Sequence, residues 1–203
     1  MSLFKKFFGS KSDQTESELK ANQRGKYMPE IKLPIDEKFT INFKANGGKF
    51  LYCDSLDEVF ENLYNIIEEN KWEEKKVLIL DKNLKDKFKD TNLEATNSIN
   101  EAFIFLTTCE NLIANDGSLL ISSNQIFEKK LPELPLNFIV FATTSQITEN
   151  IGEGLRGIKS KNKQRIPTNI TTIKHFKSSI DEKDFLSYGS SSKNLYLLLL
   201  EDL

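Results

Sequence analysis

Residues 107–121 carry the sequence TTCENLIANDGSLLI, which directly follows the apolar run Phe103–Leu106. The stretch is polar over most of its length and ends in a second apolar run. Gly117 permits a backbone conformation that is closed to other residues, so nearby N–H groups can come close to a bound molecule. The hydroxyls, amides and carboxylates here predict a site for a small anionic or polyhydroxy ligand at the mouth of a sheet. The alternative is that Asn115-Asp116-Gly117 only makes a tight hairpin turn.

Short apolar runs alternate with segments of helical periodicity on both sides of this stretch. Such runs are typical of strands that are covered on both faces, as in a parallel sheet. Ser55, with Glu58 at capping-box spacing, predicts the start of one helix, and Ser145 predicts the start of another that runs to Ile158. The alternation predicts an α/β fold with a mostly parallel central sheet flanked by helices. The expected strands are Phe50–Cys53, Val77–Leu80, Phe103–Leu106, Leu119–Ile121, Phe138–Ala142, Ile170–Ile173 and Leu195–Leu200.

The first 38 residues differ in composition from the rest of the chain. Leu3, Phe4, Phe7 and Phe8 fall on one face of a short amphipathic start that lysines flank. Residues 9–26 almost lack large apolar side chains, so we expect them to form a flexible linker. We therefore place this start and linker at 1–38 and an α/β domain at 39–203. The start predicts weak contact with a membrane surface or a partner, and the alternative is a short tail that packs on its own domain or frays.

Composition excludes several classes of function. The 203 residues hold 28 Lys and Arg against 30 Asp and Glu, and this balance argues against a general nucleic-acid-binding protein. A single histidine, His175, excludes zinc sites built from several imidazoles. Cys53 and Cys109 form no C-x-x-C pair, so we expect no iron–sulfur cluster and no other resident cofactor or metal. The unpaired cysteines, with no secretory signal and no spanning segment, predict a cytoplasmic protein.

The run Gly152-Glu153-Gly154-Leu155-Arg156-Gly157 matches the G-x-G-x-x-G pattern of dinucleotide sites. Its context differs, because the preceding strand is expected to end near Ala142 and Glu153 would lie where a phosphate should be. We interpret the glycines as a weakened helix end. The basic residues around and after them are interpreted as a solvated loop, with a phosphate-contacting loop as the alternative. These residues are Arg156, Lys159, Lys161, Lys163 and Arg165.

Residues 107–121 resemble the signature of the lactate-utilisation (LUD) domain family, which has Thr-Gly-Ala-Asp, then Ile-Ala-Glu-Thr-Gly-Thr, then an apolar strand. Thr107 and Glu110 match the first part, and Ile113-Ala114, Gly117 and Ser118 match the second. The similarity continues through the segment from Pro135 to Ala142 and extends over roughly residues 43–203. It implies a fold like that of the NagB/RpiA/CoA-transferase superfamily. It also implies an association with the oxidation of lactate to pyruvate.

The resemblance further implies that iron–sulfur partner proteins carry the redox chemistry. This chain would then be a non-redox component that binds a small-molecule ligand. Whether it is an enzyme stays open, since an isomerase or CoA-transferring activity rests on fold analogy alone. In a transferase, Glu110 is the nearest candidate for the nucleophilic carboxylate. The alternative function is a catalytically inactive scaffold or adaptor that docks on a partner or a membrane surface through its N-terminus.

The predicted ligand site draws on the signature and on one later segment. Two departures from the family pattern matter: Asn115-Asp116 replaces Glu-Thr, and residues 174–182 lack the family's Gly-Pro-Ser turn. We interpret His175 as a structural or surface histidine and Cys109 as a small buried hydrophobe. The predicted ligand-binding residues are Thr107, Thr108, Glu110, Asn115, Asp116, Gly117, Ser118, Ser179 and Asp181.

Overall fold

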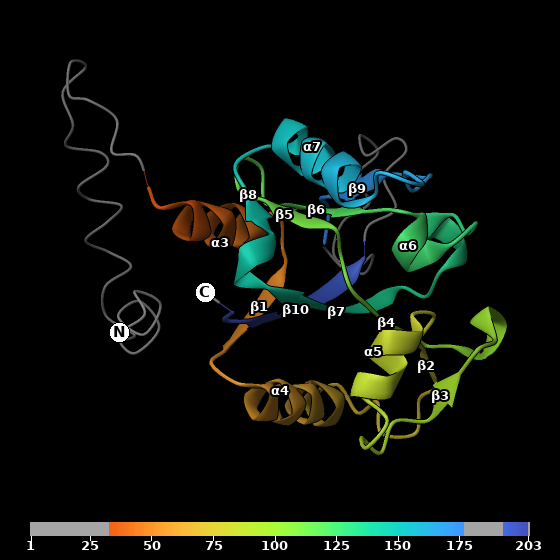
Figure 1. The fold of residues 1–203 in the computed structure, drawn as a ribbon. Coiled ribbons are helices and arrows are strands. Elements are labelled where there is room, and N and C mark those ends of the chain that lie inside the picture. The colour runs from red at the N-terminus through yellow and green to blue at the C-terminus, as the bar shows by residue number, and fades with distance from the viewer. Residues whose placement is uncertain (1–32, 177–192, 203) are drawn as a thin grey trace, which may run out of the picture. The chain divides into compact units, whose positions relative to one another are not determined.

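A computed structural model of the chain describes residues 33–176 and 193–202 (Figure 1). The predictions made for Leu3, Phe4, Phe7, Phe8, Ser179 and Asp181 lie outside these residues. The first described helix, α3 (Ile35–Ala45), begins before the domain boundary expected at residue 39. Pro34 at its N-cap has extended backbone angles, and Asp36 and Glu37 in the first turn suit the positive end of the helix dipole. Within the described ranges, no helix is long and apolar enough to cross a membrane.

The central sheet confirms the predicted α/β class. Among the described residues it has six strands, in the order β1-β10-β7-β4-β2-β3, and every neighbouring pair is parallel. The chain therefore crosses from one edge of the sheet to the other and then fills the middle. The strands are β1 (Lys49–Cys53), β2 (Val77–Leu78), β3 (Ala95–Thr96), β4 (Ile104–Thr107), β7 (Asn137–Thr143) and β10 (Asn194–Leu200).

The last strand, β10, lies in the middle of this sheet between β1 and β7. Its side chains alternate between two apolar cores: Leu195 and Leu197 belong to one, while Tyr196 and Leu198 belong to the other. All four are buried. Burying a leucine contributes roughly 1.5–3 kcal/mol, so this strand contributes strongly to stability on both faces of the sheet.

A second, smaller sheet covers one face of the central sheet, in the order β8-β5-β6-β9 (Figure 1). We expected residues 119–121 to form a strand of the parallel sheet, and this was wrong, because β6 pairs antiparallel with both β5 and β9. The chain reverses within residues 114–117, which is too short for the crossover that a parallel pair requires. The strands are β5 (Asn111–Ile113), β6 (Ser118–Ile121), β8 (Ile147–Thr148) and β9 (Thr171–Ile173).

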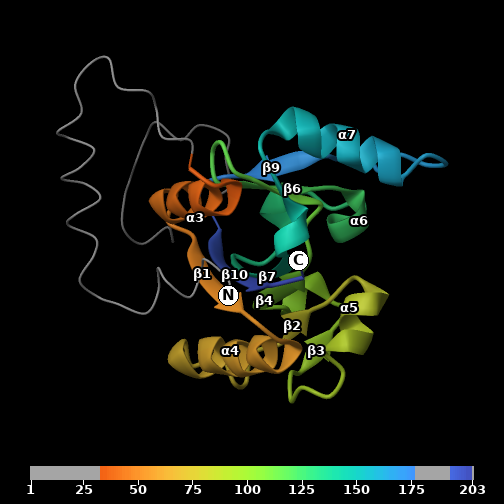
Figure 2. The same cartoon turned by 60° about the vertical axis from the view of Figure 1, so that its left-hand side comes forward.

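Helices complete the layers (Figures 1 and 2). On the face away from the small sheet lie α4 (Leu56–Glu69) and α5 (Lys82–Lys87). The predicted cap of α4 is confirmed, since the Ser55 hydroxyl accepts a hydrogen bond from the Glu58 N–H at 3.2 Å. On the outer face of the small sheet, α7 (Ile151–Lys161) packs through Ile158. The short elements are α6 (Ser123–Ile126) and the 3₁₀ helices η1 (Ile99–Glu101), η2 (Leu131–Glu133) and η3 (Thr144–Gln146).

The start of α7 differs from the prediction. Ser145 lies in η3, and the N-cap of α7 is Asn150, whose side chain accepts from the Glu153 N–H at 3.0 Å. The glycines of the G-x-G-x-x-G run therefore lie in the first turns of the helix and not at its end. The Glu153 carboxylate occupies this terminus, because it accepts from the Glu149 N–H at 3.0 Å. Gly154 serves close packing, since a Cβ there would lie 3.1 Å from the Leu120 side chain.

Gly117 closes the turn between β5 and β6 and lies against α3. Its φ is +66°, in the left-handed region that favours glycine. A Cβ at this position would overlap the backbone of Asn42 and Phe43. The same glycine therefore makes the hairpin turn and allows the hairpin to pack on the helix.

We expect Gly117→Ala to lower the free energy of unfolding by about 2–4 kcal/mol, because left-handed strain adds to the steric overlap. The matched control is Gly157→Ala in α7, where an added Cβ meets nothing within 4 Å. Since alanine favours helix, the control should raise stability by roughly 0.5–1 kcal/mol. Urea unfolding of both variants measures the difference, and equal stabilities for the two would contradict the argument.

Lys193 is buried where β10 begins. Its Nζ donates to the Leu134 and Pro135 carbonyls, each at 3.0 Å, and lies 5.0 Å from the centre of the Phe138 ring. Burial lowers the pKa of this amine from 10.5 to about 8. The unfolded chain therefore binds more protons than the folded chain between these two pH values.

It follows that the wild-type protein should gain stability as the pH rises from about 8 to 10.5. Lys193→Met should lack this gain, because the methionine does not titrate. The difference in unfolding free energy between the two proteins should change by at most about 3 kcal/mol over the window. Urea titrations at three pH values test this. Parallel pH profiles for wild type and variant would show that Lys193 keeps its ordinary pKa.

Candidate functional site

The carboxyl ends of β4, β7 and β10 lie at one edge of the central sheet, because these three parallel strands are neighbours. In open α/β sheets, ligands bind outside this edge. The segments that follow the strands here are polar, namely residues 107–110, 143–146 and 201–202. Hydrogen bonds join all three segments. We call this group of segments the carboxyl-edge site.

Glu110 is a carboxylate of the carboxyl-edge site that three side-chain donors hold. Its Oε1 accepts hydrogen bonds from Ser122 Oγ at 2.6 Å, Asn124 Nδ2 at 2.8 Å and Gln125 Nε2 at 3.3 Å. Ser122, the N-cap of α6, is fully buried, and its own N–H donates to Gln125. These donors fix the orientation of the carboxylate. Among the described residues, no hydrogen bond to Oε2 accompanies these three.

Gln146 joins the segment after β4 to the segment after β7. Its Nε2 donates to the Cys109 carbonyl at 2.6 Å, and its Oε1 accepts from the Thr143 N–H at 2.8 Å. Asn111 Nδ2 in turn donates to the Gln146 carbonyl at 3.2 Å. One side chain therefore holds two strand ends in register.

Asp202 joins the segment after β10 to the segment after β7. Its carboxylate accepts from Thr144 Oγ1 at 2.9 Å, and from the N–H and Oγ of Ser145 at 2.8 and 2.7 Å. Desolvation by itself would raise the pKa of Asp202, but the hydrogen bonds from Ser145 and Thr144 outweigh it and lower the pKa to about 2. The carboxylate is therefore ionised at neutral pH and ties the end of β10 to the end of β7.

The signature residues divide into two groups in the tertiary structure. Thr107, Thr108 and Glu110 lie at the carboxyl edge, where the buried Thr107 Oγ1 donates to the Thr108 carbonyl at 3.3 Å. Residues 115–118 lie at the tip of the β5–β6 hairpin, which packs on α3. The predicted ligand residues do not form one cluster, because strand β5 separates the two groups.

The polar groups at the hairpin tip bind the protein itself. Lys38 of α3 donates to Asn115 Oδ1 at 2.6 Å, and Asn46 Nδ2 donates to the Asp116 carbonyl at 2.7 Å. Within the turn, Ser118 Oγ donates to Asp116 Oδ1 at 2.6 Å. These contacts explain the residue types at 115–118 without a ligand, although the ligand prediction for them stays open.

Sequence reasoning missed Ser122, Asn124, Gln146 and Asp202. The spacing of Ser122 and Gln125 is that of a capping box, so the start of α6 could have been found from the sequence. Asp202 comes two residues after the end of a predicted strand, which also places it at a carboxyl edge. Its contact with Ser145 depends on the order of the strands, and no local pattern encodes that order.

Both cysteines of the chain are buried, and the histidine lies outside the carboxyl-edge site. Cys109 is buried, and desolvation together with the nearby Glu110 charge raises the pKa of its thiol, which fits the small buried hydrophobe predicted here. Cys53 is buried at the end of β1, and burial raises the pKa of its thiol too. His175 is exposed and lies elsewhere. In the part of the chain that the structure describes, no three His, Cys, Asp or Glu side chains gather as metal ligands.

The model of the LUD domain family matches residues 37–200. This chain belongs to the LUD domain family. The match begins inside α3 and ends with β10, so it includes both sheets and the carboxyl-edge site up to the end of β10. The family resemblance read from residues 107–121 is therefore confirmed.

A solved structure supports the same fold for this LUD domain. The chain is similar to a DUF162 family protein from Deinococcus radiodurans, with a TM-score of 0.60 and 12% sequence identity. The similarity covers 84% of this chain and 100% of the other. At this identity the likeness concerns the fold alone. A search of curated proteins found no match.

We expect Asp202→Asn to lower the melting temperature at pH 7, because the amide accepts weaker hydrogen bonds from Ser145 and Thr144. A carboxylate whose folded pKa is below the usual 3.8 contributes stability above that pH and loses the contribution as the pH falls toward 2. The difference in melting temperature between wild type and variant should therefore become smaller below about pH 4.

Thermal unfolding followed by circular dichroism between pH 7 and pH 3 measures this difference. Asp90→Asn is the matched control, since it removes an exposed aspartate and should change the melting temperature little at any pH. A melting-temperature difference that stays constant with pH would mean that the charge of the Asp202 carboxylate does not contribute to stability.

Proposed function

We propose that this LUD domain protein is a non-redox component of lactate utilisation, in which lactate is oxidised to pyruvate, and that it binds a small-molecule ligand at the carboxyl-edge site. Membership of the LUD family supports the association with lactate utilisation. The observation that carries the ligand site is the Glu110 carboxylate, which three side-chain donors orient from one side. Such preorganisation is what a binding group requires.

The non-redox assignment rests on the cysteines. An iron–sulfur cluster generally needs four thiolates, and this chain has two cysteines in all. Burial raises the pKa of both thiols, which disfavours the thiolate form that binds metal or reacts. Electron transfer would therefore belong to iron–sulfur partner proteins.

The chemistry of the site favours a hydroxyl-bearing ligand over a strongly anionic one. Residues 107–110, 143–146 and 201–202 include three carboxylates and several hydroxyls, and they contain no Lys or Arg. Carboxylates accept hydrogen bonds from hydroxyl groups and repel anions. Of the two ligand kinds expected from the sequence, the polyhydroxy or hydroxy compound is thus the better fit. Glu110 would accept a ligand hydroxyl through Oε2.

The test is a calorimetric titration of the full-length protein with L-lactate, pyruvate, glycerol and D-ribose. L-lactate and pyruvate form a matched pair that differs only at the hydroxyl-bearing carbon. Hydroxyl-bearing compounds should bind, and Glu110→Gln should weaken that binding by roughly tenfold or more, the cost of about one charge-assisted hydrogen bond.

The control is Glu61→Gln, which removes an exposed carboxylate from α4 on the opposite face of the sheet. Its affinity should stay within about twofold of the wild-type value. If no compound binds, or if Glu110→Gln binds as well as wild type, the site is wrongly assigned. Stronger binding of pyruvate than of L-lactate would refute the preference for a hydroxyl.

A scaffold or adaptor role is the second proposal. Its support is the sequence of the start, where Leu3, Phe4, Phe7 and Phe8 stand beside Lys5 and Lys6. Sedimentation with vesicles that contain anionic lipid, and affinity capture of the full chain from cells grown on lactate, would compare wild type with Phe4→Ser/Phe8→Ser. Equal recovery of lipid and of partner proteins by both forms would refute docking through this segment.

A further inference from the structure

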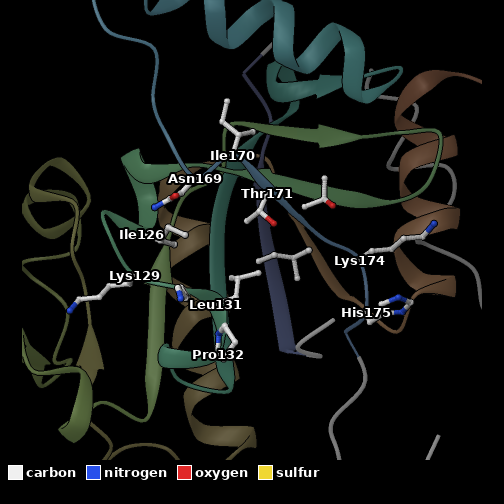
Figure 3. A pocket seen from close by; sticks show the side chains of 12 residues that line it. Ile126, Lys129, Leu131, Pro132, Asn169, Ile170, Thr171, Lys174 and His175 are labelled. Carbon is white, nitrogen blue, oxygen red and sulfur yellow. The ribbon is translucent and has the colours of Figure 1, made fainter. Parts of the chain in front are cut away.

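A second candidate site lies along β9, at the edge of the small sheet. An open cavity of about 380 Å³ lies there between residues 126–132 and residues 169–175 (Figure 3). Residues 131–132 lie in η2, a few residues before β7 begins, and the His175 carbonyl accepts from the N–H of Lys193, the residue before β10. One end of the cavity therefore lies toward the amino ends of the strands. Its other end borders α6, where Ile126 lines the cavity and the neighbouring Gln125 donates to Glu110.

The cavity follows the outer edge of the small sheet. Strand β9 is the last strand of that sheet and pairs only with β6 among the described strands. Its free side, with Thr171 and the preceding Asn169, supplies polar groups to the cavity. Thr172 also lines it, and the apolar lining residues are Ile126, Leu131, Pro132, Ile170 and Ile173.

Basic side chains flank this apolar lining on two sides. Lys129 stands at one side of the cavity, and Lys174 and His175 stand at the other (Figure 3). Lys130 also contributes, and none of the described lining residues is Asp or Glu. In the described part of the chain, Asp116 lies 3.8 Å from the Lys174 amine, Glu133 accepts from the Lys130 N–H, and Glu128 precedes Lys129.

The chain around the cavity strengthens this positive field. Residues 154–176, which run from α7 into the lining, contain no Asp or Glu. Their basic side chains outside the lining are all exposed, so they raise the local concentration of anions. They are Arg156, Lys159, Lys161, Lys163 and Arg165.

We propose that this cavity binds an organic phosphate with an apolar body, in addition to the ligand of the carboxyl-edge site. Its volume falls in the range of small-molecule sites. Lysines act as mobile point charges that suit a phosphate dianion, and they stand on both sides of the opening. The apolar lining would hold the non-phosphate part of the ligand. An organic phosphate should therefore bind more tightly than inorganic phosphate. This proposal does not depend on the function of the carboxyl-edge site.

The experiment uses 1-naphthyl phosphate as the probe, with 1-naphthol and inorganic phosphate for comparison. His175 is the only histidine in the chain, so its imidazole gives a single isolated NMR signal from the cavity. Titration of the full-length protein with 1-naphthyl phosphate at constant pH should shift this signal saturably. Inorganic phosphate and 1-naphthol should each bind more weakly by roughly tenfold or more. Inorganic phosphate lacks the apolar body, and 1-naphthol lacks the phosphate.

Two double variants test the role of the lysines. Lys129→Glu/Lys174→Glu should weaken binding of 1-naphthyl phosphate by roughly tenfold or more. Lys129→Gln/Lys130→Gln leaves the pair of Lys174 and Asp116 intact and should weaken binding of 1-naphthyl phosphate by about fivefold. This second variant keeps the proposal testable if the first one folds poorly. The control Lys85→Glu/Lys89→Glu makes the same change of net charge on exposed residues at α5, on the opposite face of the central sheet (Figure 1).

The control should bind within about twofold of wild type. The proposal is overturned if the His175 signal does not move. It is also overturned if both cavity variants bind as well as wild type, if the control loses as much affinity as they do, or if 1-naphthol binds as tightly as the phosphate. Those last two results would indicate a general charge effect and apolar adsorption, respectively.

Discussion

The pairing of β10 between β1 and β7 is the constraint on which the rest of the structure depends. The strand comes last in the chain and lies in the middle of the sheet, so the sheet is complete only when the C-terminal segment is inserted. Its leucines belong to the cores on both faces of the sheet, where they are buried. The two ends of the strand then define two different chemical surroundings.

At the carboxyl end, Asp202 holds the segment after β7, and Gln146 holds that segment to the one after β4. This region has carboxylates and hydroxyls. At the amino end, Lys193 is buried on backbone carbonyls, and His175 leads into a cavity bordered by lysines. The near-neutral net charge of the chain conceals this division. Parallel strands place all their carboxyl ends at one edge and all their amino ends at the other, so Asp202 and Lys193 lie at opposite edges of the central sheet. Helix α6 borders both regions, since Gln125 donates to Glu110 and Ile126 lines the cavity.

The stretch at residues 107–121 shows how far local sequence can be trusted. Its apolar runs predicted strands and Gly117 predicted a turn, and both predictions agree with the structure. The assignment of Leu119–Ile121 to the parallel sheet failed, because a run of three apolar residues looks the same in a buried antiparallel strand. The sequence also predicted one polar site across the whole stretch. In the structure its residues form two groups, because strand β5 lies between the carboxyl edge and the hairpin tip, which packs on α3. Similarly, Ser145 has the properties of a helix cap, but Asp202 binds it and Asn150 caps α7 instead.

The sequence by itself determined the α/β class, the family, most of the strands of the central sheet and a cysteine count too low for an iron–sulfur cluster with four thiolates. These features can be predicted because they depend on local periodicity, on motif order and on composition. None of these requires knowledge of contacts between distant parts of the chain. Only the tertiary structure decided the order of the strands, the second sheet, the partners of Glu110 and Asp202, and the cavity beside β9. Those features depend on contacts between residues far apart in sequence, such as Ser145 with Asp202 and Lys193 with His175. Such contacts are selected by the packing of the whole core, and no local pattern specifies them.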